Sequence, residues 1–581
     1  MRYEKQILAA YDRLGFKPRD NQVDAVNQIC VACLDENKKH IVLSAPTGTG
    51  KSVISAVAAE VIHEIRYPDH HKDASFLLTA TNVLAAQYRD TFIDEDDPLN
   101  TNFVMVKGAN NYACAALSTQ EEPQTAENCA VMLFRKSKMD DIIASTCDVC
   151  EYAQMKAVRN KARHLITNYS YYFVDRLYTR LLEKRTMCIF DEAHLLNDLF
   201  VEHNAIFFSE KRLAQYVEEI NEHLQLGDAN IYKIIKKVKD ALVAGKITEE
   251  NFTDYLQAIA EVYQEVHLAA KAAAESNVRN QSKYLKLNKL AKKYFGLHCK
   301  IDDFFIFGYP HVFEYKAKDP KKGQQDHEVS VKPIFVGAMF DTLINADFNL
   351  LMSATIDMEY VKRTMNLDPA ETKYIKLPPS FPIENKKIVF FKPMTLNYNT
   401  LKDQAVVKKM CATTYEIVKH HTDKGERGLV LCPSFAVVES ISEVLRVMKG
   451  GYRVFEHQRG DKLADVLAEF KEYTGGPAVI LSPSGYEGVD LPGDQARYTV
   501  VVKAPFGSLG DKRIQTILEQ YPTIYSRTTL MKLTQGAGRA VRSAEDYATT
   551  YFLDTAIQRL WSRDNPWSDE FMTCYSSTLI D

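Results

Sequence analysis

The chain has 581 residues, of which 46% are apolar and 25% charged, with 24 glycines and 20 prolines. At roughly 150 residues per domain we expect about four domain-sized units, and the composition excludes collagen-like, low-complexity and disordered proteins. Basic and acidic residues number 72 and 76, a net charge of −4. A bound nucleic acid must therefore lie in a local basic groove rather than be held by overall charge.

The sequence has no long apolar run, and its first residues lack the apolar core of a signal peptide. We therefore expect no membrane association, and a cytoplasmic location in a bacterial or viral host cell or a nuclear one in a eukaryote. The eleven cysteines are an odd number, which argues against a disulfide framework in a chain without a secretory signal. Cys30-Val-Ala-Cys33 lies in an amphipathic stretch and is predicted to be core rather than a redox or metal pair.

A phosphate-binding loop is predicted near the N-terminus. Residues 39–44 form a short apolar run, Ala45-Pro-Thr-Gly-Thr-Gly-Lys51-Ser52 follows, and a helical pattern begins at Val53. A strand, a glycine-rich loop and a helix in this order are the context in which backbone amides bind phosphate. The strict Walker pattern has glycine where this chain has Ala45. In such a loop the lysine bridges the β- and γ-phosphates of ATP, and the next hydroxyl binds Mg²⁺. The predicted nucleotide-binding residues are Thr47, Gly48, Thr49, Gly50, Lys51 and Ser52.

A pair of carboxylates is predicted to act with this loop. Residues 75–80 and 186–190 have the pattern of buried strands, and Asp191-Glu-Ala-His194 directly follows the second of them. At the carboxyl end of a parallel strand, Asp191 could hold magnesium through water, and Glu192 could orient or deprotonate the attacking water. The alternative is an acidic surface turn, which the phosphate loop upstream disfavours.

Four cysteines lie between these two strands, namely Cys114, Cys129, Cys147 and Cys150. Four thiolates can hold a tetrahedral zinc ion or an iron–sulfur cluster, and the spacing alone does not separate the two. Buried structural cysteines without a metal are the third possibility.

From about residue 204 to residue 300 the chain is rich in Ala, Lys, Glu and Gln, lacks proline and keeps helical periodicity. We predict an inserted all-helical subdomain there. Its lysines could line the path of a nucleic-acid strand, although a solvated helix face is the simpler interpretation. These lysines are Lys283, Lys286, Lys289, Lys292 and Lys293. After a charged loop at 316–322, strand-like runs return at 329–336 and 348–352. The second run leads into Ser353-Ala-Thr355, whose two hydroxyls could couple nucleotide state to a neighbouring domain.

The prolines of residues 377–382 mark a linker, beyond which a second α/β unit is predicted. Its strands are expected at residues 387–391, 428–432, 478–482 and 498–503. Gln535-Gly-Ala-Gly-Arg539-Ala-Val-Arg542 places two guanidinium groups three residues apart, on one face if helical. An arginine that reaches the γ-phosphate from a second domain makes hydrolysis depend on domain closure. Arg539 and Arg542 are therefore candidate catalytic residues, together with Lys51, Asp191 and Glu192.

These motifs, in this order over two α/β units, resemble those of superfamily 2 helicases. Gly485-Tyr-Glu-Gly-Val-Asp490 matches motif V of that superfamily. Arg19-Asp-Asn-Gln22 looks like its adenine-side element, which makes Gln22 a candidate nucleotide-binding residue.

The segments beside the cysteines resemble one family more closely. Lys107–Tyr112, Leu165–Tyr169 and Ser380-Phe-Pro382 are similar to elements of the XPD/DinG family, in which an iron–sulfur domain is inserted at this point. The family's usual proline after the fourth cysteine is Glu151 here, and the helical insertion is short compared with that of eukaryotic members.

The resemblance implies an α/β fold of two RecA-like motor domains with parallel sheets, the first of which carries an inserted iron–sulfur domain and an inserted helical arch. The implied boundaries are 1–105, 161–199 and 308–377 for the first motor domain, 106–160 for the cluster domain, 200–307 for the arch and 378–581 for the second motor domain. A four-iron, four-sulfur (4Fe–4S) cluster on the four cysteines is also implied, with ATP-driven 5′-to-3′ translocation on single-stranded DNA and duplex separation.

The expected partners are single-stranded DNA and tailed or forked duplex DNA, bound by a monomeric motor. Candidate DNA contacts by position are Thr81, Gln87, Asn168 and Tyr169. Tyr112 is expected either to stack on a base or to pack on the cluster. Two other functions stay open: a DNA or RNA translocase that hydrolyses ATP without opening duplexes, and an interaction subunit with a vestigial motor.

Overall fold

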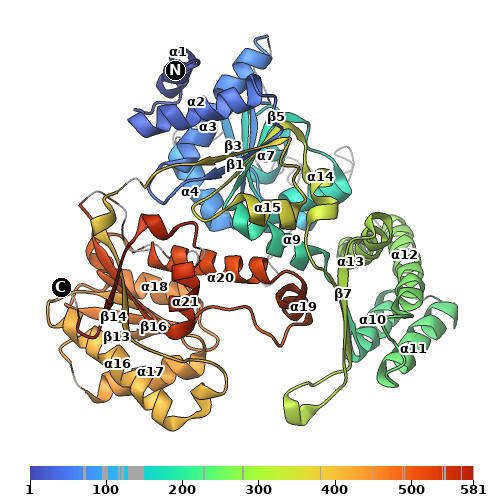
Figure 1. The fold of residues 1–581 in the computed structure, drawn as a ribbon. Helices are drawn as coiled ribbons and strands as arrows, with labels where there is room; N and C mark the ends of the chain where they lie inside the picture. The colour runs from blue at the N-terminus through green and yellow to red at the C-terminus, as the bar shows by residue number, and fades with distance from the viewer. Residues whose placement is uncertain are drawn as a thin grey trace.

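The structure is a computed structural model. It describes residues 1–69, 73–93, 102–114, 118, 124–128, 150–224, 226, 229–277, 280–379, 381–448, 450–486, 489, 491–538, 541, 543, 545–563 and 565–579. Two parallel seven-stranded sheets and one three-stranded antiparallel sheet form the framework. The predicted α/β class with two parallel-sheet units is confirmed (Figure 1).

The first sheet is built from two parts of the sequence that a long insertion separates. Its strands, in spatial order, are β10 (Thr372–Lys376), β1 (His40–Ser44), β9 (Ala346–Ser353), β5 (Arg185–Asp191), β2 (Ser75–Thr79), β4 (His164–Asn168) and β3 (Phe103–Met105). The central strands are apolar throughout and buried on both faces, as parallel strands covered by helices require. Residues of β1 divide between two hydrophobic cores, Val42 in one and Ile41 with Leu43 in the other.

Helices cover both faces of this sheet. Residues of four helices share a core with Ile41 and Leu43: α1 (Glu4–Arg13), α2 (Asp20–Leu34), α3 (Lys51–Arg66) and α4 (Asn82–Phe92). On the Val42 side the core includes residues of α7 (Glu151–Val158), α8 (Tyr169–Val174), α9 (Leu196–Asn204), α14 (Phe340–Leu343) and α15 (Met358–Met365). Cys30 and Cys33 lie fully buried in α2, which confirms that they are core residues.

The second sheet is formed by the C-terminal third of the chain. Its order is β13 (Arg453–Glu456), β14 (Ala478–Ser482), β12 (Gly428–Leu431), β15 (Tyr498–Val501), β16 (Ala548–Asp554), β11 (Lys386–Met394) and β17 (Met572–Ser576). α16 (Gln404–Thr422) and α17 (Phe435–Val447) contribute to the core on one face. α18 (Leu463–Glu472), α20 (Pro522–Ala537) and α21 (Thr555–Arg563) contribute to the core on the other.

The insertion between β5 and β9 departs from the prediction in one respect. It contains the expected helices α10 (Glu210–His223), α11 (Ala229–Val243), α12 (Phe252–Ser276) and α13 (Gln281–Phe307). However, β6 (Ile206–Ser209) lies inside the stretch predicted to be all helical and pairs with β8 (Glu328–Pro333), which also pairs with β7 (His311–Lys316). The small sheet forms because β6 is only four residues long and gains its partner more than 100 residues later, a pairing that local periodicity cannot indicate.

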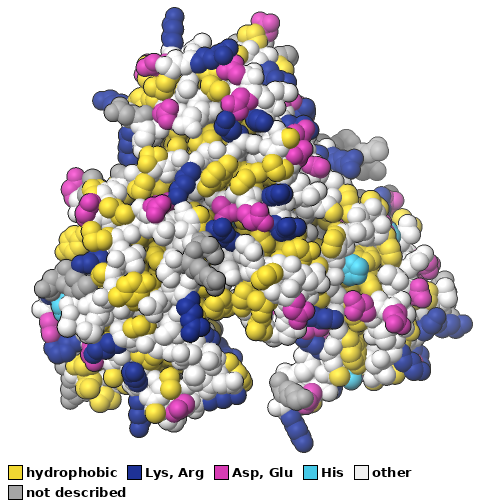
Figure 2. Space-filling model, in the orientation of Figure 1, with side chains coloured by type: hydrophobic (Ala, Val, Ile, Leu, Met, Phe, Trp, Pro, Cys, Tyr) yellow, Lys and Arg dark blue, Asp and Glu magenta, His cyan; other side chains and the backbone are white. Residues whose placement is uncertain are grey.

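The insertion lies beside both α/β units (Figure 1). α19 (Lys512–Gln520) reaches from the second unit to the small sheet, where Lys512 Nζ donates to the Phe313 carbonyl at 2.9 Å and Lys332 pairs with Asp511 at 2.9 Å. Figure 2 shows the molecule hollowed between the second unit and the β7–β8 hairpin, with basic and acidic side chains interspersed on this face. Within the part of the chain that the structure describes, no helix is both long and apolar enough to cross a membrane.

Candidate active site

The glycine-rich loop lies between β1 and α3 at the carboxyl edge of the first sheet. Gly48 and Gly50 have φ angles of 85° and 75°, a region that glycine adopts without steric cost. A Cβ atom would overlap the ring of Phe381 at Gly48 and the side-chain amide of Gln22 at Gly50. The sequence therefore needs glycine at both positions, for conformation and for space.

Two residues ahead of the loop hold it in place. Gln22 is buried, donates from Nε2 to the Thr49 carbonyl at 2.8 Å and accepts from the Arg19 amide at 3.1 Å. Arg19 donates to the Gly48 carbonyl at 3.0 Å. Both polar ends of the Gln22 amide are thus engaged within the chain, so in this structure Gln22 braces the loop.

Lys51 is the first residue of α3, so the phosphate loop leads directly into a helix N-terminus, whose free backbone amides favour anions. The Lys51 Nζ is 3.4 Å from the Ala45 carbonyl, a long hydrogen bond that leaves the ammonium available to a ligand. The positive-φ glycines, the helix N-terminus and this lysine fit a bound polyphosphate.

Asp191 ends β5, and Glu192 follows in the left-handed conformation with φ 51°. The Asp191 carboxylate is buried and accepts from the Glu192 amide at 3.0 Å. Burial and the neighbouring Glu192 charge raise the pKa of Asp191 to about 6, against the opposing effect of Lys51. The Tyr88 hydroxyl is buried near this carboxylate, and burial and the Asp191 charge raise the pKa of Tyr88. A divalent cation would satisfy this cluster, so the residues fit the predicted Mg²⁺.

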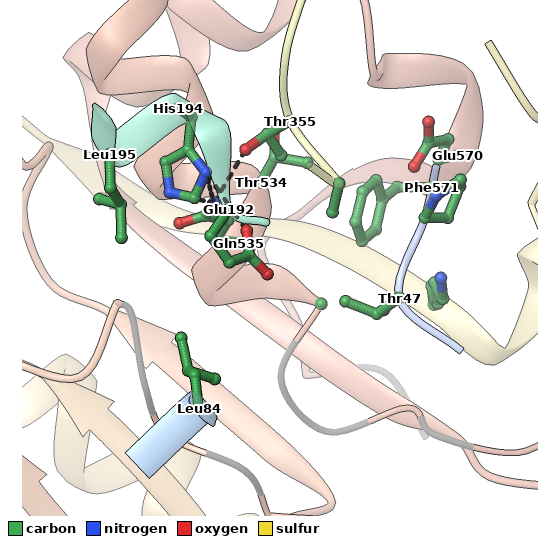
Figure 3. Close-up of a pocket in the computed structure, with 14 residues that line it drawn as sticks. Thr47, Leu84, Glu192, His194, Leu195, Thr355, Thr534, Gln535, Glu570 and Phe571 are labelled. Atoms are coloured by element: carbon green, nitrogen blue, oxygen red, sulfur yellow. Dashed lines mark hydrogen bonds and ion pairs between the residues drawn. The ribbon is translucent and has the colours of Figure 1, made fainter. Parts of the chain in front are cut away.

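A chain of polar contacts joins the first α/β unit to the second (Figure 3). His194 Nδ1 lies 3.3 Å from the Glu192 carboxylate and 2.8 Å from the Ser353 hydroxyl. On the other side of the ring, Gln535 Nε2 of α20 lies 2.8 Å from His194 Nε2 and donates to the Thr355 hydroxyl at 2.9 Å. The two hydroxyls predicted to couple nucleotide state to a neighbouring domain therefore contact this chain.

A cleft between the two units contains these contacts. It is lined by Pro46, Thr47, Leu84, Glu192, His194, Leu195, Ala354, Thr355, Lys386, Thr534, Gln535, Gly538, Glu570 and Phe571. Its lining therefore includes residues of the phosphate loop, three residues that follow Asp191 (Glu192, His194 and Leu195), and residues next to β11 and β17 of the second sheet. The end of α20 approaches the loop, since a Cβ on Gly538 would lie 3.9 Å from the Thr47 hydroxyl. The predicted catalytic residues Arg539 and Arg542 and the motif residue Asp490 lie outside the described residues.

Two of the four predicted cluster ligands are described, as free thiols: Cys114 is buried and Cys150 half-buried. The Tyr112 ring packs on Tyr152 with centroids 5.5 Å apart, so the segments that carry the two cysteines meet. Tyr112 also accepts through its carbonyl from the Ala126 amide at 2.8 Å, which places the segment before Cys129 beside them. Cys129 and Cys147 lie outside the described residues, within which no group of three or more potential metal ligands occurs. The converging segments fit a thiolate-bound metal centre, and the identity of that centre stays a prediction.

The predicted DNA contacts separate into exposed and buried residues. Thr81, which caps the N-terminus of α4, and Gln87 within that helix are both exposed. Asn168 donates to Asn82 Oδ1 at 2.5 Å at the carboxyl ends of β2 and β4. Tyr169 is fully buried and donates from its hydroxyl to the Asp191 carbonyl at 2.6 Å, so the prediction that it contacts DNA is wrong. An aromatic residue directly after a buried strand is as well placed to pack under the sheet as to face the solvent.

Tyr112 and the lysine series have clear environments. Tyr112 is 3% exposed and accepts from the Lys107 amide at 3.0 Å, so it packs inside rather than stacking on a base. The five lysines of α13 that the sequence analysis singled out are exposed. Among them, Lys292 donates to the Glu127 carbonyl at 2.7 Å, and Lys293 pairs with Glu219 at 2.6 Å. The helix thus contacts the cysteine-bearing segment.

Sequence reasoning missed a second cavity, at the carboxyl edge of the second sheet. It is lined by Cys432, Pro433, Pro483, Ser484, Gly485, Tyr486, Lys503, Ala504, Pro505, Phe506 and Lys532. Phe506 stacks on Tyr525 with ring centroids 5.4 Å apart. Two lysines beside a stacked aromatic pair are the groups that single-stranded nucleic acids contact. The available signal was the rule that ligands bind at the carboxyl ends of parallel strands.

Two protein families match the chain. "Helicase C-terminal domain" matches residues 417–566, and "Type III restriction enzyme, res subunit" matches residues 15–227. The relative "ATP-dependent DNA helicase YoaA" of Haemophilus influenzae is 20% identical, with 94% of this chain and 92% of the relative covered. "ATP-dependent DNA helicase DinG" of Photobacterium profundum is 21% identical, with 95% and 96% covered. A solved structure named "XPD_Helicase" superimposes with a TM-score of 0.60 at 16% identity, over 96% of this chain and 100% of that one.

The phosphate loop, the carboxylate pair and the contacts across two parallel-sheet units define a nucleotide-dependent motor of the superfamily 2 architecture. Within that class, the similarity to relatives named YoaA and DinG supports the predicted resemblance to the XPD/DinG family, and the similarity to the XPD structure supports the fold which that resemblance implies.

Proposed function

We propose that the protein is an ATP-dependent DNA helicase that translocates on single-stranded DNA in the 5′-to-3′ direction and separates duplexes. The observation that carries the proposal is the contact chain from Glu192 through His194 to Gln535. It links the group best placed to activate water to a helix of the other motor domain. Chemistry at the loop and movement between the domains are therefore mechanically connected.

In this proposal the phosphate loop binds the β- and γ-phosphates through its amides and Lys51, and Ser52 and Asp191 would hold Mg²⁺. The chemistry that the ion would supply there is neutralisation of the charge that develops on the phosphates during hydrolysis. Glu192 accepts a proton from the attacking water, and its 3.3 Å contacts with Ser353 and His194 orient it. Arg539 and Arg542 act from the second domain, a role supported by the approach of Gly538 to Thr47.

Single-stranded DNA, offered by tailed or forked duplexes, would cross the carboxyl edges of both sheets. Thr81, Gln87 and Asn168 offer polar contacts on the first domain, and Lys503 with Lys532 offer basic ones on the second. Contacts to phosphates and stacked bases suit a motor that must move along any sequence. The monomeric state and the cytoplasmic location stay predictions.

We propose further that Cys114, Cys129, Cys147 and Cys150 hold a 4Fe–4S cluster. The cluster domain would span residues 106–160 and the arch residues 200–307, both inserted in the first motor domain. The meeting of the Cys114 and Cys150 segments supports a shared centre. The contact of Lys292 with the Glu127 carbonyl supports a cluster domain packed on the arch. Four thiolates on a rigid insertion would supply a fixed edge against which a duplex can be split.

Strand displacement on 5′-tailed and 3′-tailed duplexes tests the function, with single-stranded-DNA-stimulated ATP hydrolysis measured beside it. We expect unwinding of the 5′-tailed substrate, and its loss together with ATPase activity in Lys51→Ala, whose fold is unchanged by circular dichroism. Lys39→Ala, a surface lysine that pairs with Glu371, is the matched control and should behave as wild type. ATP hydrolysis without displacement of either substrate would instead indicate a translocase, and full turnover in Lys51→Ala would place the nucleotide site elsewhere.

A further inference from the structure

Glu570 is a buried residue whose carboxyl oxygen Oε1 has no hydrogen-bond partner in the part of the chain that the structure describes. The residue is only 5% exposed. It takes part in none of the ion pairs found among those residues. Burial raises the pKa of this carboxyl to about 7, although Lys376, Lys386 and Lys51 act in the other direction. A buried polar group without a hydrogen bond is costly, so a folded protein retains one where something pairs with it.

The position of Glu570 indicates which ligand that is. Glu570 and Phe571 line the inter-domain cleft together with Thr47 of the phosphate loop. Figure 3 shows them at one end of this pocket, with Glu192, His194 and Gln535 at the other. Any nucleotide whose phosphates occupy the loop would extend into this cleft.

The charges around Glu570 indicate which part of the nucleotide it meets. The ammonium of Lys386 lies 5.7 Å from the centroids of both Phe381 and Phe571, and its residue is 3% exposed. Lys376 donates to the Pro566 carbonyl at 2.6 Å. Phosphate suits these lysines and Lys51, but a carboxylate repels phosphate. Glu570 must therefore face a part of the ligand that donates hydrogen bonds, which in a nucleotide is the sugar or the base.

We propose that Glu570, with the ring of Phe571 beside it, forms a nucleoside subsite, in which its carboxylate accepts a hydrogen bond from a sugar hydroxyl or a base N–H. The subsite rests on the proposed function, since it requires the nucleotide to occupy the phosphate loop. In this subsite, Glu570 of the second motor domain discriminates between nucleotides. Nucleoside contacts would then help to close the cleft, because they form only when the second domain reaches the ligand.

Isothermal titration calorimetry on the full chain with Mg²⁺ tests the subsite with four ligands that are not turned over. These are ADP, 2′-deoxyADP, inosine diphosphate, which lacks the 6-amino group, and pyrophosphate, which lacks the nucleoside. We expect Glu570→Ala to lower the affinity for ADP by about tenfold or more, which is the range for loss of a hydrogen bond to a charged acceptor. Pyrophosphate should bind as in wild type or more tightly. Asp569→Asn, the exposed neighbouring carboxyl, is the matched control and should leave all four affinities unchanged.

The analogues identify the donor. One of the two analogues, 2′-deoxyADP or inosine diphosphate, should lack the hydrogen-bond donor. That analogue should bind the wild-type protein more weakly than ADP does, and its affinity should not fall further in Glu570→Ala. Such non-additivity is expected of a direct contact. If the alanine variant fails to fold, Glu570→Gln takes its place. This variant keeps the side-chain shape and an acceptor oxygen, so its loss of ADP affinity should be smaller. An unchanged ADP affinity, or equal losses for ADP and pyrophosphate, would overturn the subsite. Unchanged binding of both ligands in Lys51→Ala would instead overturn the proposed nucleotide site itself.

Discussion

Asp191 and Glu192 are neighbours with opposite surroundings. In an extended strand, consecutive side chains point to opposite faces, which would separate the two carboxylates. The left-handed conformation of Glu192, with φ 51°, breaks this alternation where β5 ends. Asp191 stays buried beside Tyr88, while Glu192 turns toward Ser353 and His194. A non-glycine residue in this conformation costs about 1–2 kcal/mol, which the contacts of Glu192 offset.

Glu192→Gln isolates the role of the carboxylate as a base. The amide keeps the shape and can still accept from Ser353, but it cannot take a proton at neutral pH. We expect kcat for ATP hydrolysis to fall by about 10²- to 10⁴-fold, the usual contribution of a general base. The dissociation constant for ATP, measured by calorimetry, should change little. Glu202→Gln, an exposed residue of α9, serves as the control. An equal loss of ATP affinity would show that Glu192 binds ATP rather than activating the attacking water.

Single residues also show where sequence reasoning succeeds. Lys51, Asp191 and Glu192 were recognisable because each follows a strand at short range, and the structure brings the loops that carry them to one sheet edge. Glu570 and Lys386 had no such signal, since they reach the cleft through the pairing of β11 with β17, about 180 residues apart in sequence. Tyr169 was predicted to contact DNA although it is buried, because its position after a strand does not reveal which way the ring points.

At the scale of elements, α20 of the second α/β unit contacts the neighbours of Glu192, the proposed general base. Gln535 lies two residues before its C-terminal end and contacts both His194 and Thr355. A helix is rigid over this length, so a shift of His194 by a fraction of an ångström is transmitted along α20 rather than absorbed by it. The residues that follow the helix include Arg539 and Arg542.

Gln535→Ala tests this connection. It removes two hydrogen bonds that together contribute about 1–3 kcal/mol, so DNA-stimulated kcat should fall by about 5- to 150-fold. The affinity for ADP should be retained, since Gln535 is not among the residues proposed to hold phosphate. Gln515→Ala, an exposed glutamine of α19, is the matched control. If the variant hydrolyses ATP and unwinds DNA like wild type, the contact chain does not couple the two domains.

The cysteine insertion is predicted to separate ATP hydrolysis from unwinding. Cys114→Ser should remove the cluster and strand displacement while sparing much of the ATPase activity, because the phosphate loop lies on other elements. Iron and sulfide are measured on protein purified without oxygen, with about four of each per chain expected in wild type. Cys574→Ser, a half-buried thiol on β17, should keep both metal and unwinding. Iron-free wild-type protein, or zinc in its place, would refute the cluster.

The strands of the two motor domains were predictable because parallel strands buried on both faces are continuous apolar runs. Residues 39–44, 186–190, 348–352 and 478–482 all fall within a residue or two of β1, β5, β9 and β14. β6 and β7 were not found, since an antiparallel strand with one exposed face is short and alternating, and β6 begins beside helix-rich sequence. Its partner is fixed only by the fold of the whole insertion.

At the scale of the whole molecule, α19 contacts both the first α/β unit and the insertion between β5 and β9. Arg513 is buried, donates from Nε to the Ile334 carbonyl at 3.0 Å and pairs with Asp198 of α9 at 3.0 Å. Lys512 and Asp511 add contacts to β7 and β8 on either side. Because none of these residues lines the nucleotide cleft, we predict that they form a fixed point about which the two domains close on ATP.

Arg513→Ala should loosen that fixed point. Removing the guanidinium leaves the Ile334 carbonyl without its donor and costs about 1–3 kcal/mol in docking, so amide hydrogen exchange in 311–333 and 512–520 should accelerate by about 5- to 150-fold. Exchange in β1 and β12, inside the two sheets, should not change. ATP hydrolysis should continue while strand displacement falls, because closure of the cleft would no longer be converted into movement of the arch. Arg559→Ala, an exposed arginine of α21, controls for loss of charge. Unchanged exchange in both segments would show that α19 is not the pivot, and the domains would then move about the cleft itself.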